Sequence, residues 1–184
     1  MAGTFPYDSG RYSVGTRKGV RVMIPVGIAS LSVDSASNQP VIILRPLEGD
    51  GGRLLPIWIG QNEATAILLA LQDIAPPRPM THDLLKDAIE ALGAEVSRVE
   101  ITRIDGGTFY ALIVLSGPGD MTLEVDARPS DSIALAVRTG APIFISEQVL
   151  DEAAVVEVTE EDEETQVEQF REFLEGVDPE DFQG

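Results

Sequence analysis

Glycine-rich turns divide residues 93–127 into three short apolar stretches, and this pattern constrains the fold more than any other feature of the chain. Each stretch has the length of a strand and contains β-branched or aromatic residues. Tight turns separate them at 105–107 and 117–120. Strands joined by such short turns pair antiparallel. We therefore expect antiparallel strands at Val96–Ile104, Thr108–Leu115 and Met121–Ala127.

Segments with helical periodicity lie between other predicted strands. An amphipathic helix is expected from Thr81, as N-cap, to Gly93, and a shorter one from Ser130, as N-cap, to Gly140. The helix expected at 62–73 is apolar almost all round, which predicts burial on more than one side, within the fold or by a second subunit. Further strands are expected around Val26–Leu31 and at Val41–Leu47, Leu54–Ile59 and Pro142–Ile145.

These elements predict an α/β (α+β) fold with a mixed, mostly antiparallel sheet and two to three packed helices. Short segments also repeat. An Arg-Pro pair followed by Ser or Thr and Asp occurs at 78–83 and at 128–131, and Pro-Ile-aromatic-Ile occurs at 56–59 and at 142–145. The repeat predicts two related β–helix elements, although sequences this short also match by chance.

The net charge of −18 is concentrated at the C-terminal end of the 184 residues. Residues 151–184 hold 14 acids and one base, and residues 1–150 carry only −5. Neither part has the basic stripe of a tight nucleic-acid binder. Apolar residues at 167, 170 and 174 predict a C-terminal helix that docks on its own domain or on a partner.

We therefore divide the chain into a disordered leader at 1–22, an α/β domain at 23–158, and an acidic linker with a C-terminal helix at 159–184. Cysteine is absent, the N-terminus has no signal-peptide pattern, and no apolar run approaches the roughly 20 residues that cross a bilayer. These features predict a cytoplasmic protein without a membrane segment.

Five blocks of sequence resemble the bifunctional nuclease domain family of bacteria and plants. They lie, in the family's order, at 55–64, 78–84, 107–111, 126–136 and 138–143. The resemblance covers roughly residues 25–150, and the segment 170–182 resembles the C-terminal extension of actinobacterial members. It implies an α/β fold, nuclease activity on DNA and RNA, and self-association. It implies no defined catalytic set, so the site is argued from the residues.

The segment 126–131 offers the richest chemistry for phosphodiester hydrolysis. Asp126 and Arg128 alternate at the end of a predicted strand, so their side chains are expected to point the same way. Asp131 opens the next helix, whose free N–H groups favour a phosphate. A structural interpretation is equally open: Arg128 bridges the two aspartates, Ser130 caps the helix, and Asp131 complements its dipole.

His82 is the sole histidine and is a candidate base or acid beside Asp83. A packed or capping histidine is the structural alternative. Glu63 and Asp83 each lie in the first turn of a predicted helix, where a carboxylate also serves the dipole. If the repeated elements face each other, Glu63, Asp83, Asp126 and Asp131 converge and hold Mg²⁺ or Mn²⁺.

Three functions are consistent with these features. The first is a metal-assisted nuclease with Asp126, Arg128, Asp131 and His82 as catalytic residues. The second is a non-enzymatic, homo-oligomeric interaction or regulatory module, in which helix 62–73 makes the subunit contact. The third is a small-molecule or nucleotide sensor that uses the helix N-termini at Thr81 and Ser130.

Overall fold

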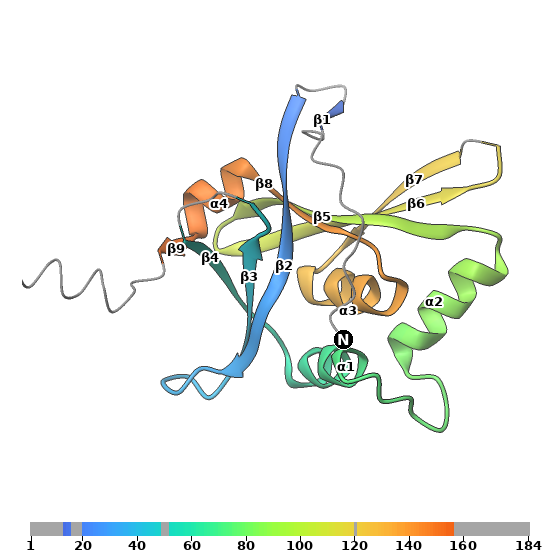
Figure 1. The fold of residues 1–184 in the computed structure, drawn as a ribbon, viewed down its shortest axis with the longest axis horizontal. Helices are drawn as coiled ribbons and strands as arrows, with labels where there is room; N and C mark the ends of the chain where they lie inside the picture. The colour runs from blue at the N-terminus through green and yellow to red at the C-terminus, as the bar shows by residue number, and fades with distance from the viewer. Residues whose placement is uncertain (1–12, 16–19, 49–51, 120, 157–184) are drawn as a thin grey trace, which may run out of the picture.

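The computed structural model describes residues 13–15, 20–48, 52–119 and 121–156 (Figure 1). It contains one sheet in the order β7-β6-β5-β8-β2-β3-β4-β9, with β1 paired to β2. Every neighbouring pair is antiparallel except β5 and β8, which run parallel. The predicted α/β fold with a mixed, mostly antiparallel sheet is confirmed.

The strands are β1 (Ser13–Gly15), β2 (Val20–Val33), β3 (Pro40–Pro46), β4 (Arg53–Trp58), β5 (Glu95–Asp105), β6 (Thr108–Gly117), β7 (Met121–Ala127), β8 (Ile143–Ser146) and β9 (Val155–Val156). The helices are α1 (Gln61–Leu71), α2 (Thr81–Ala91), α3 (Pro129–Thr139) and α4 (Glu147–Ala153).

The expected meander is present, since β5 pairs with β6 and β6 pairs with β7. Gly106 and Gly107 both have positive φ in the first turn, a conformation that glycine adopts without steric cost. Gly93 and Gly140 also have positive φ just after α2 and α3, as expected of residues that end helices. Turn chemistry therefore sets these boundaries.

The two predicted caps are placed differently in the structure. Met80, not Thr81, is the N-cap of α2, and Arg128, not Ser130, is the N-cap of α3. Pro129 occupies the first turn of α3, where its missing N–H costs nothing. Ser130 thus lies inside the helix and is buried, with 7% of its surface exposed.

Some elements were not foreseen. β1, α4 and β9 have no counterpart in the sequence prediction. β1 and the start of β2 also fall within the predicted leader at 1–22, whose residues 13–15 and 20–22 are in strands. The predicted acidic linker and C-terminal helix at 159–184 lie outside the described residues.

The core lies on one face of the sheet. The registers align Val99 with Ile143 and Ile101 with Ile145 between β5 and β8, and Ile42 with Ile57 between β3 and β4. α1, α3 and α4 contribute Ile67, Ile133, Leu135, Val149 and Leu150 to the same buried cluster. α3 packs on α1, α2, β5 and β6, which makes it the central helix.

Helices α1, α2 and α3 gather together, whereas α4 lies at another end of the molecule against β2, β4, β5 and β8 (Figure 1). The first turns of α1, α2 and α3 carry Glu63, Asp83 and Asp131 respectively. Because α3 contacts both other helices, the fold brings these distant segments together. None of the helices in the described part of the chain is long and apolar enough to span a membrane.

Candidate active site at the meeting of three helices

Arg128 links residues that are far apart in the sequence. As N-cap of α3 it has an extended backbone, with φ −72° and ψ 147°, and its side chain lies across the starts of α1 and α3. Its Nη2 donates to Glu63 Oε1 at 2.7 Å and to Asp131 Oδ1 at 3.1 Å, and its Nε donates to Asp131 Oδ2 at 2.6 Å. One guanidinium therefore binds both carboxylates.

His82 completes this group from the third helix. Its Nε2 lies 3.1 Å from Asp131 Oδ1, and the residue is buried with 9% of its surface exposed. We call Glu63, His82, Arg128 and Asp131 the Arg128 cluster. Its members come from α1, α2, α3 and the N-cap of α3.

The cluster is graded from a buried interior to an exposed guanidinium. The side chains of His82, Glu63 and Asp131 are 11%, 17% and 28% exposed, and that of Arg128 is 66% exposed. A ligand from solvent therefore meets Arg128 first. The two carboxylates and one guanidinium give the cluster a net charge of −1 when His82 is neutral.

The electrostatics keep Asp131 ionised. Burial alone raises the pKa of the Asp131 carboxyl, but hydrogen bonds and charge from Arg128, and then from His82, outweigh burial and lower it below 3.8. Hydrogen bonds to Asp131 and then to Glu63 raise the pKa of the Arg128 guanidinium above its usual range. An ionised Asp131 can only accept hydrogen bonds, so His82 Nε2 must be the donor in their contact.

A glycine makes room for this arrangement. Gly60 is the N-cap of α1, and a Cβ built there would collide with the Glu63 carboxylate, which turns back over the helix start. The sequence predicts only that a strand ends at Ile59, directly before this glycine. Its signal is the Gly-x-x-Glu spacing at the start of a helix, which has other uses and is not specific.

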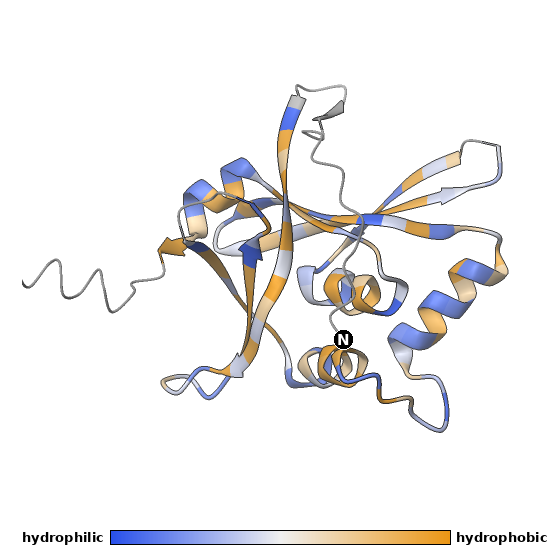
Figure 2. Ribbon diagram, in the orientation of Figure 1, coloured by the Kyte–Doolittle hydropathy of each residue, from blue (hydrophilic) through white to orange (hydrophobic). Residues whose placement is uncertain are grey.

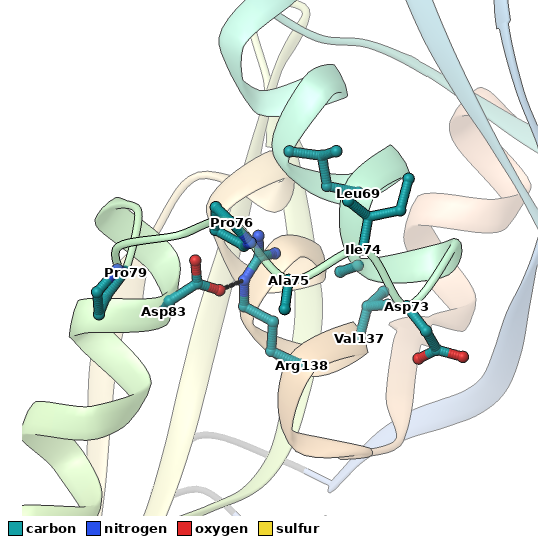
Figure 3. Close-up of a pocket in the computed structure, with 10 residues that line it drawn as sticks. Leu69, Asp73, Ile74, Ala75, Pro76, Pro79, Asp83, Val137 and Arg138 are labelled. Carbon is teal, nitrogen blue, oxygen red and sulfur yellow. Dashed lines mark hydrogen bonds and ion pairs between the residues drawn. The ribbon is translucent and has the colours of Figure 1, made fainter.

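Asp83 belongs to a second, adjacent pair. Arg138 Nε donates to Asp83 Oδ1 at 2.5 Å, and the Met80 backbone N–H donates to Asp83 Oδ2 at 2.9 Å. Burial raises the pKa of the Asp83 carboxyl, but the Arg138 hydrogen bond and then the Met80 N–H outweigh burial and lower it. The pair borders an open cavity of about 410 Å³ between α1, α3 and the segment 72–79 (Figure 3).

Asp126 lies apart from the cluster. In β7 it is aligned with Leu112, whereas its neighbour Val125 is aligned with the core residue Ile113. Adjacent strand residues point to opposite faces, so Asp126 faces away from the core side on which α3 packs. Within the described residues, Asp126 makes none of the hydrogen bonds or ion pairs that connect the other candidates.

The expected convergence of four carboxylates is therefore seen for two. Glu63 and Asp131 meet at Arg128, Asp83 faces Arg138, and Asp126 is separate. The structural alternative expected Arg128 to bridge Asp126 and Asp131. Arg128 does bind Asp131, but its second carboxylate partner is Glu63. Among the residues that the structure describes, no three His, Asp or Glu side chains are placed to hold a metal ion. Glu63 and Asp131 share the Arg128 guanidinium, and Asp83 and Asp126 lie elsewhere, so the four carboxylates do not form a metal centre as they are arranged.

Comparison with known proteins identifies the family. The bifunctional nuclease domain profile matches residues 42–158, which contain all four members of the Arg128 cluster. The chain therefore belongs to the bifunctional nuclease domain family.

Two kinds of relatives match it. An uncharacterized protein of Mycobacterium tuberculosis is 46% identical over 164 residues, which cover 85% of this chain and 96% of that protein. Bifunctional nuclease 1 of Oryza sativa subsp. japonica is 30% identical over 118 residues, covering 63% of this chain and 35% of the plant protein. Bifunctional nuclease 2 of Arabidopsis thaliana is 31% identical over 106 residues, covering 56% of this chain and 32% of its own length. The match thus spans about a third of the plant proteins.

Proposed function

We propose that this chain hydrolyses phosphodiester bonds in DNA or RNA and that the Arg128 cluster is its active site. The observation that carries the proposal is the convergence of an exposed guanidinium, two carboxylates and an imidazole from three helices. Membership of the bifunctional nuclease domain family and the names of the plant relatives support the same activity.

Arg128 is suited to bind the scissile phosphate. Its side chain is 66% exposed, and hydrogen bonds to Glu63 and Asp131 hold the guanidinium in place. Three of its five N–H groups bind the two carboxylates, and the two on Nη1 make none of these bonds and can donate to a phosphate. The guanidinium charge also stabilises the additional negative charge of the transition state. The N-terminus of α3, which starts one residue later, adds a favourable dipole for an anion.

His82 and Asp131 are suited to proton transfer. With Nε2–H donated to Asp131, the Nδ1 lone pair of His82 is the one that can accept a proton from an attacking water. The water oxygen then bonds to phosphorus, the P–O bond to the leaving group breaks, and the imidazolium returns the proton to the leaving oxygen. Asp131 remains ionised throughout and stabilises the imidazolium.

Assistance by Mg²⁺ or Mn²⁺ stays a prediction. The residues do not form a metal centre as they are arranged, so the roles proposed above are those of the protein's own side chains. Bound metal would add charge neutralisation at the phosphate and activation of water. Cleavage assays with added metal ion and with EDTA test whether the reaction depends on Mg²⁺ or Mn²⁺.

The test is cleavage of labelled single-stranded DNA and RNA with Mg²⁺, Mn²⁺ or EDTA. Asp131→Asn is expected to reduce cleavage about 100-fold or more, in the range of general base and electrostatic contributions. Asp126→Asn is the matched control, since it makes the same chemical change on the exposed face of β7 and is expected to keep wild-type activity. Equal losses in both variants, or none in either, would contradict the proposed site.

Arg128 gives a second, independent measurement. The affinity for single-stranded nucleic acid depends on salt through the phosphates that the protein neutralises, with a slope of about 0.7 per phosphate. Arg128→Met is expected to lower that slope by about this amount. An unchanged slope would show that Arg128 does not contact the phosphate backbone.

A homo-oligomeric interaction module is the second candidate, and one observation favours it. The leucines of the apolar stripe on α2 are turned outward: Leu84 is 62% exposed and Leu92, just after the helix, is 82% exposed, and His82 is the sole buried residue of this helix. On α1, the helix expected at the subunit contact, Leu68 and Leu71 are also exposed. In Figure 2, apolar and polar bands alternate along α2.

A second copy of the chain is the proposed occupant of this surface. The edge strand β7 adds exposed Met121, Leu123 and Val125, and antiparallel pairing of two copies about Leu123 sets Met121 against Val125 and Glu124 against Thr122. Light scattering of the wild type and of Leu92→Glu tests it: an oligomer that the substitution dissociates supports the module, and a wild-type monomer refutes it.

The cytoplasmic location and the partner of the acidic C-terminal segment stay predictions. Both predictions rest on the composition and charge of the sequence alone, and both are compatible with either proposed function.

A further inference from the structure

Arg138 is a buried arginine that binds three helices at once. It lies in the last turn of α3 with 7% of its side chain exposed. Its Nε donates to Asp83 on α2, its Nη1 to the Ala134 carbonyl of α3 at 2.8 Å, and its Nη2 to the Ala66 carbonyl of α1 at 3.0 Å. Figure 3 shows its guanidinium directed from α3 toward Asp83, beside the segment that leads into α2.

Each partner of Arg138 lies next to a member of the Arg128 cluster. Ala66 is one helical turn after Glu63, and Asp83 directly follows His82. Asp131 and Arg138 are seven residues apart on α3, which is about two turns or roughly 10 Å along one face. The Asp83–Arg138 and His82–Asp131 pairs therefore attach the start of α2 to one face of α3 at two points, about two helical turns apart.

The contact through Asp83 controls where α2 begins. The Asp83 carboxylate accepts from the Met80 N–H with one oxygen and from Arg138 with the other. The Asp83 side chain therefore anchors the first turn of α2 to α3. His82 lies in the same turn. Ile89 also packs against the core, but the leucines of this helix face outward.

We propose that Arg138 is the positioning residue of the Arg128 cluster. It sets His82 against Asp131 by holding the middle of α1 and the start of α2 to α3. Lysine cannot replace it fully, because one ammonium lacks the planar fork that reaches three acceptors in different directions. The catalytic consequence rests on the proposed function, whereas the positioning itself can be tested without any activity.

The test uses the ring resonances of His82, which is the sole histidine of the chain. Imidazole ¹⁵N and ¹H shifts are measured at neutral pH for the wild type, Asp131→Ala, Arg138→Met and Arg138→Lys. Asp131→Ala removes the acceptor of the His82 Nε2–H and so defines the signature of a lost His82–Asp131 contact. Arg138→Met is expected to reproduce that shift, and Arg138→Lys to give part of it. If Arg138→Met does not fold, the lysine variant alone decides.

Arg98→Met is the matched control for a general loss of stability. Arg98 Nε donates to Glu100 Oε1 at 2.6 Å, and Glu100 is buried with 4% of its surface exposed. This substitution also removes the arginine partner of a carboxylate, but in β5 rather than among the three helices. It is expected to lower stability while His82 keeps its wild-type resonances.

Cleavage measurements complete the test. Displacement of a catalytic group by about 1 Å costs on the order of 100-fold in rate. We expect Arg138→Lys to lower kcat by about that factor, with KM unchanged, because Arg138 does not contact substrate. Wild-type His82 resonances in both folded Arg138 variants would overturn the proposal, as would a shift equally large in Arg98→Met. If the wild type cleaves nothing, the proposed function fails and the His82 resonances still decide the role of Arg138.

Discussion

Replacing Arg128 by methionine tests the electrostatics of the cluster, because Met keeps much of the aliphatic length and removes the charge. Arg128 binds two carboxylates with three hydrogen bonds of 2.6–3.1 Å. Hydrogen bonds to charged groups contribute about 1.5–3 kcal/mol when they are buried, and exposed ion pairs about 0.2–1 kcal/mol. The acids are largely buried but Arg128 is 66% exposed, so solvent screening places each of the two pairs near 1 kcal/mol.

The expected loss in the free energy of unfolding is therefore about 2 kcal/mol at pH 7. For a chain of this size, about 1 kcal/mol changes Tm by 2–4 °C, so the variant should melt about 4–8 °C below the wild type. Calorimetry or circular dichroism measures this directly. Lys86→Met is the control, since Lys86 is 3.8 Å from Glu90 in an exposed pair worth about 0.5 kcal/mol or less.

The pH dependence identifies the origin of the loss. The pKa of Asp131 is lower in the folded state than its unfolded value of 3.8, so its pairing stabilises the protein above that pH. The contribution disappears as the pH falls through the folded pKa. The difference in Tm between wild type and Arg128→Met should shrink below about pH 4. A difference that stays constant from pH 7 to pH 3 would refute the ion-pair explanation.

Three further substitutions test the packing and the backbone. Leu135→Ala should lower the free energy of unfolding by about 2–5 kcal/mol, because Leu135 is fully buried, whereas Leu84→Ala on the exposed side of α2 should change it by less than about 0.5 kcal/mol in urea titrations of the monomer. Gly140→Ala should cost about 1–2 kcal/mol, because Gly140 ends α3 with φ 71°; a neutral result would contradict the left-handed cap. Ser146→Ala should cost about 0.5–2 kcal/mol, because its hydroxyl caps α4 and also donates to the Thr102 carbonyl, and calorimetry measures the loss.

Much of the secondary structure could be predicted because its signals are local. β7 was predicted with its observed bounds, since a glycine-rich turn precedes it and an Arg-Pro pair follows it. The predicted start of α2 was one residue too late. The Asp83 carboxylate accepts a hydrogen bond from the Met80 N–H, which makes Met80 the N-cap. α4 and β9 were missed, because a seven-residue helix and a two-residue strand carry too little periodicity and depend on packing.

The α2 stripe shows where a local pattern misleads. Its apolar residues recur at helical spacing, which normally predicts a face turned to the core. In the structure Ile89 packs against the core but the leucines of this stripe are exposed, and the polar residues His82 and Asp83 make hydrogen bonds to α3. Periodicity identifies which residues share a face, but tertiary contacts decide whether the core or another molecule covers that face.

The sequence by itself determined the class of fold, the family and most of the candidate residues. Strand alternation, turn glycines and helix ends are properties of neighbouring residues in the chain. They can be recognised without knowing which distant residues each element contacts. Only the tertiary structure decided which candidates meet. Glu63 and Arg128 are separated by 65 positions and His82 and Asp131 by 49, and these pairs form because α3 packs against both α1 and α2. The same packing leaves Asp126 on the other face of β7, although it is two residues from Arg128 in the chain. Side-chain direction across a strand end, and the angle at which three helices cross, are determined by the core that they share.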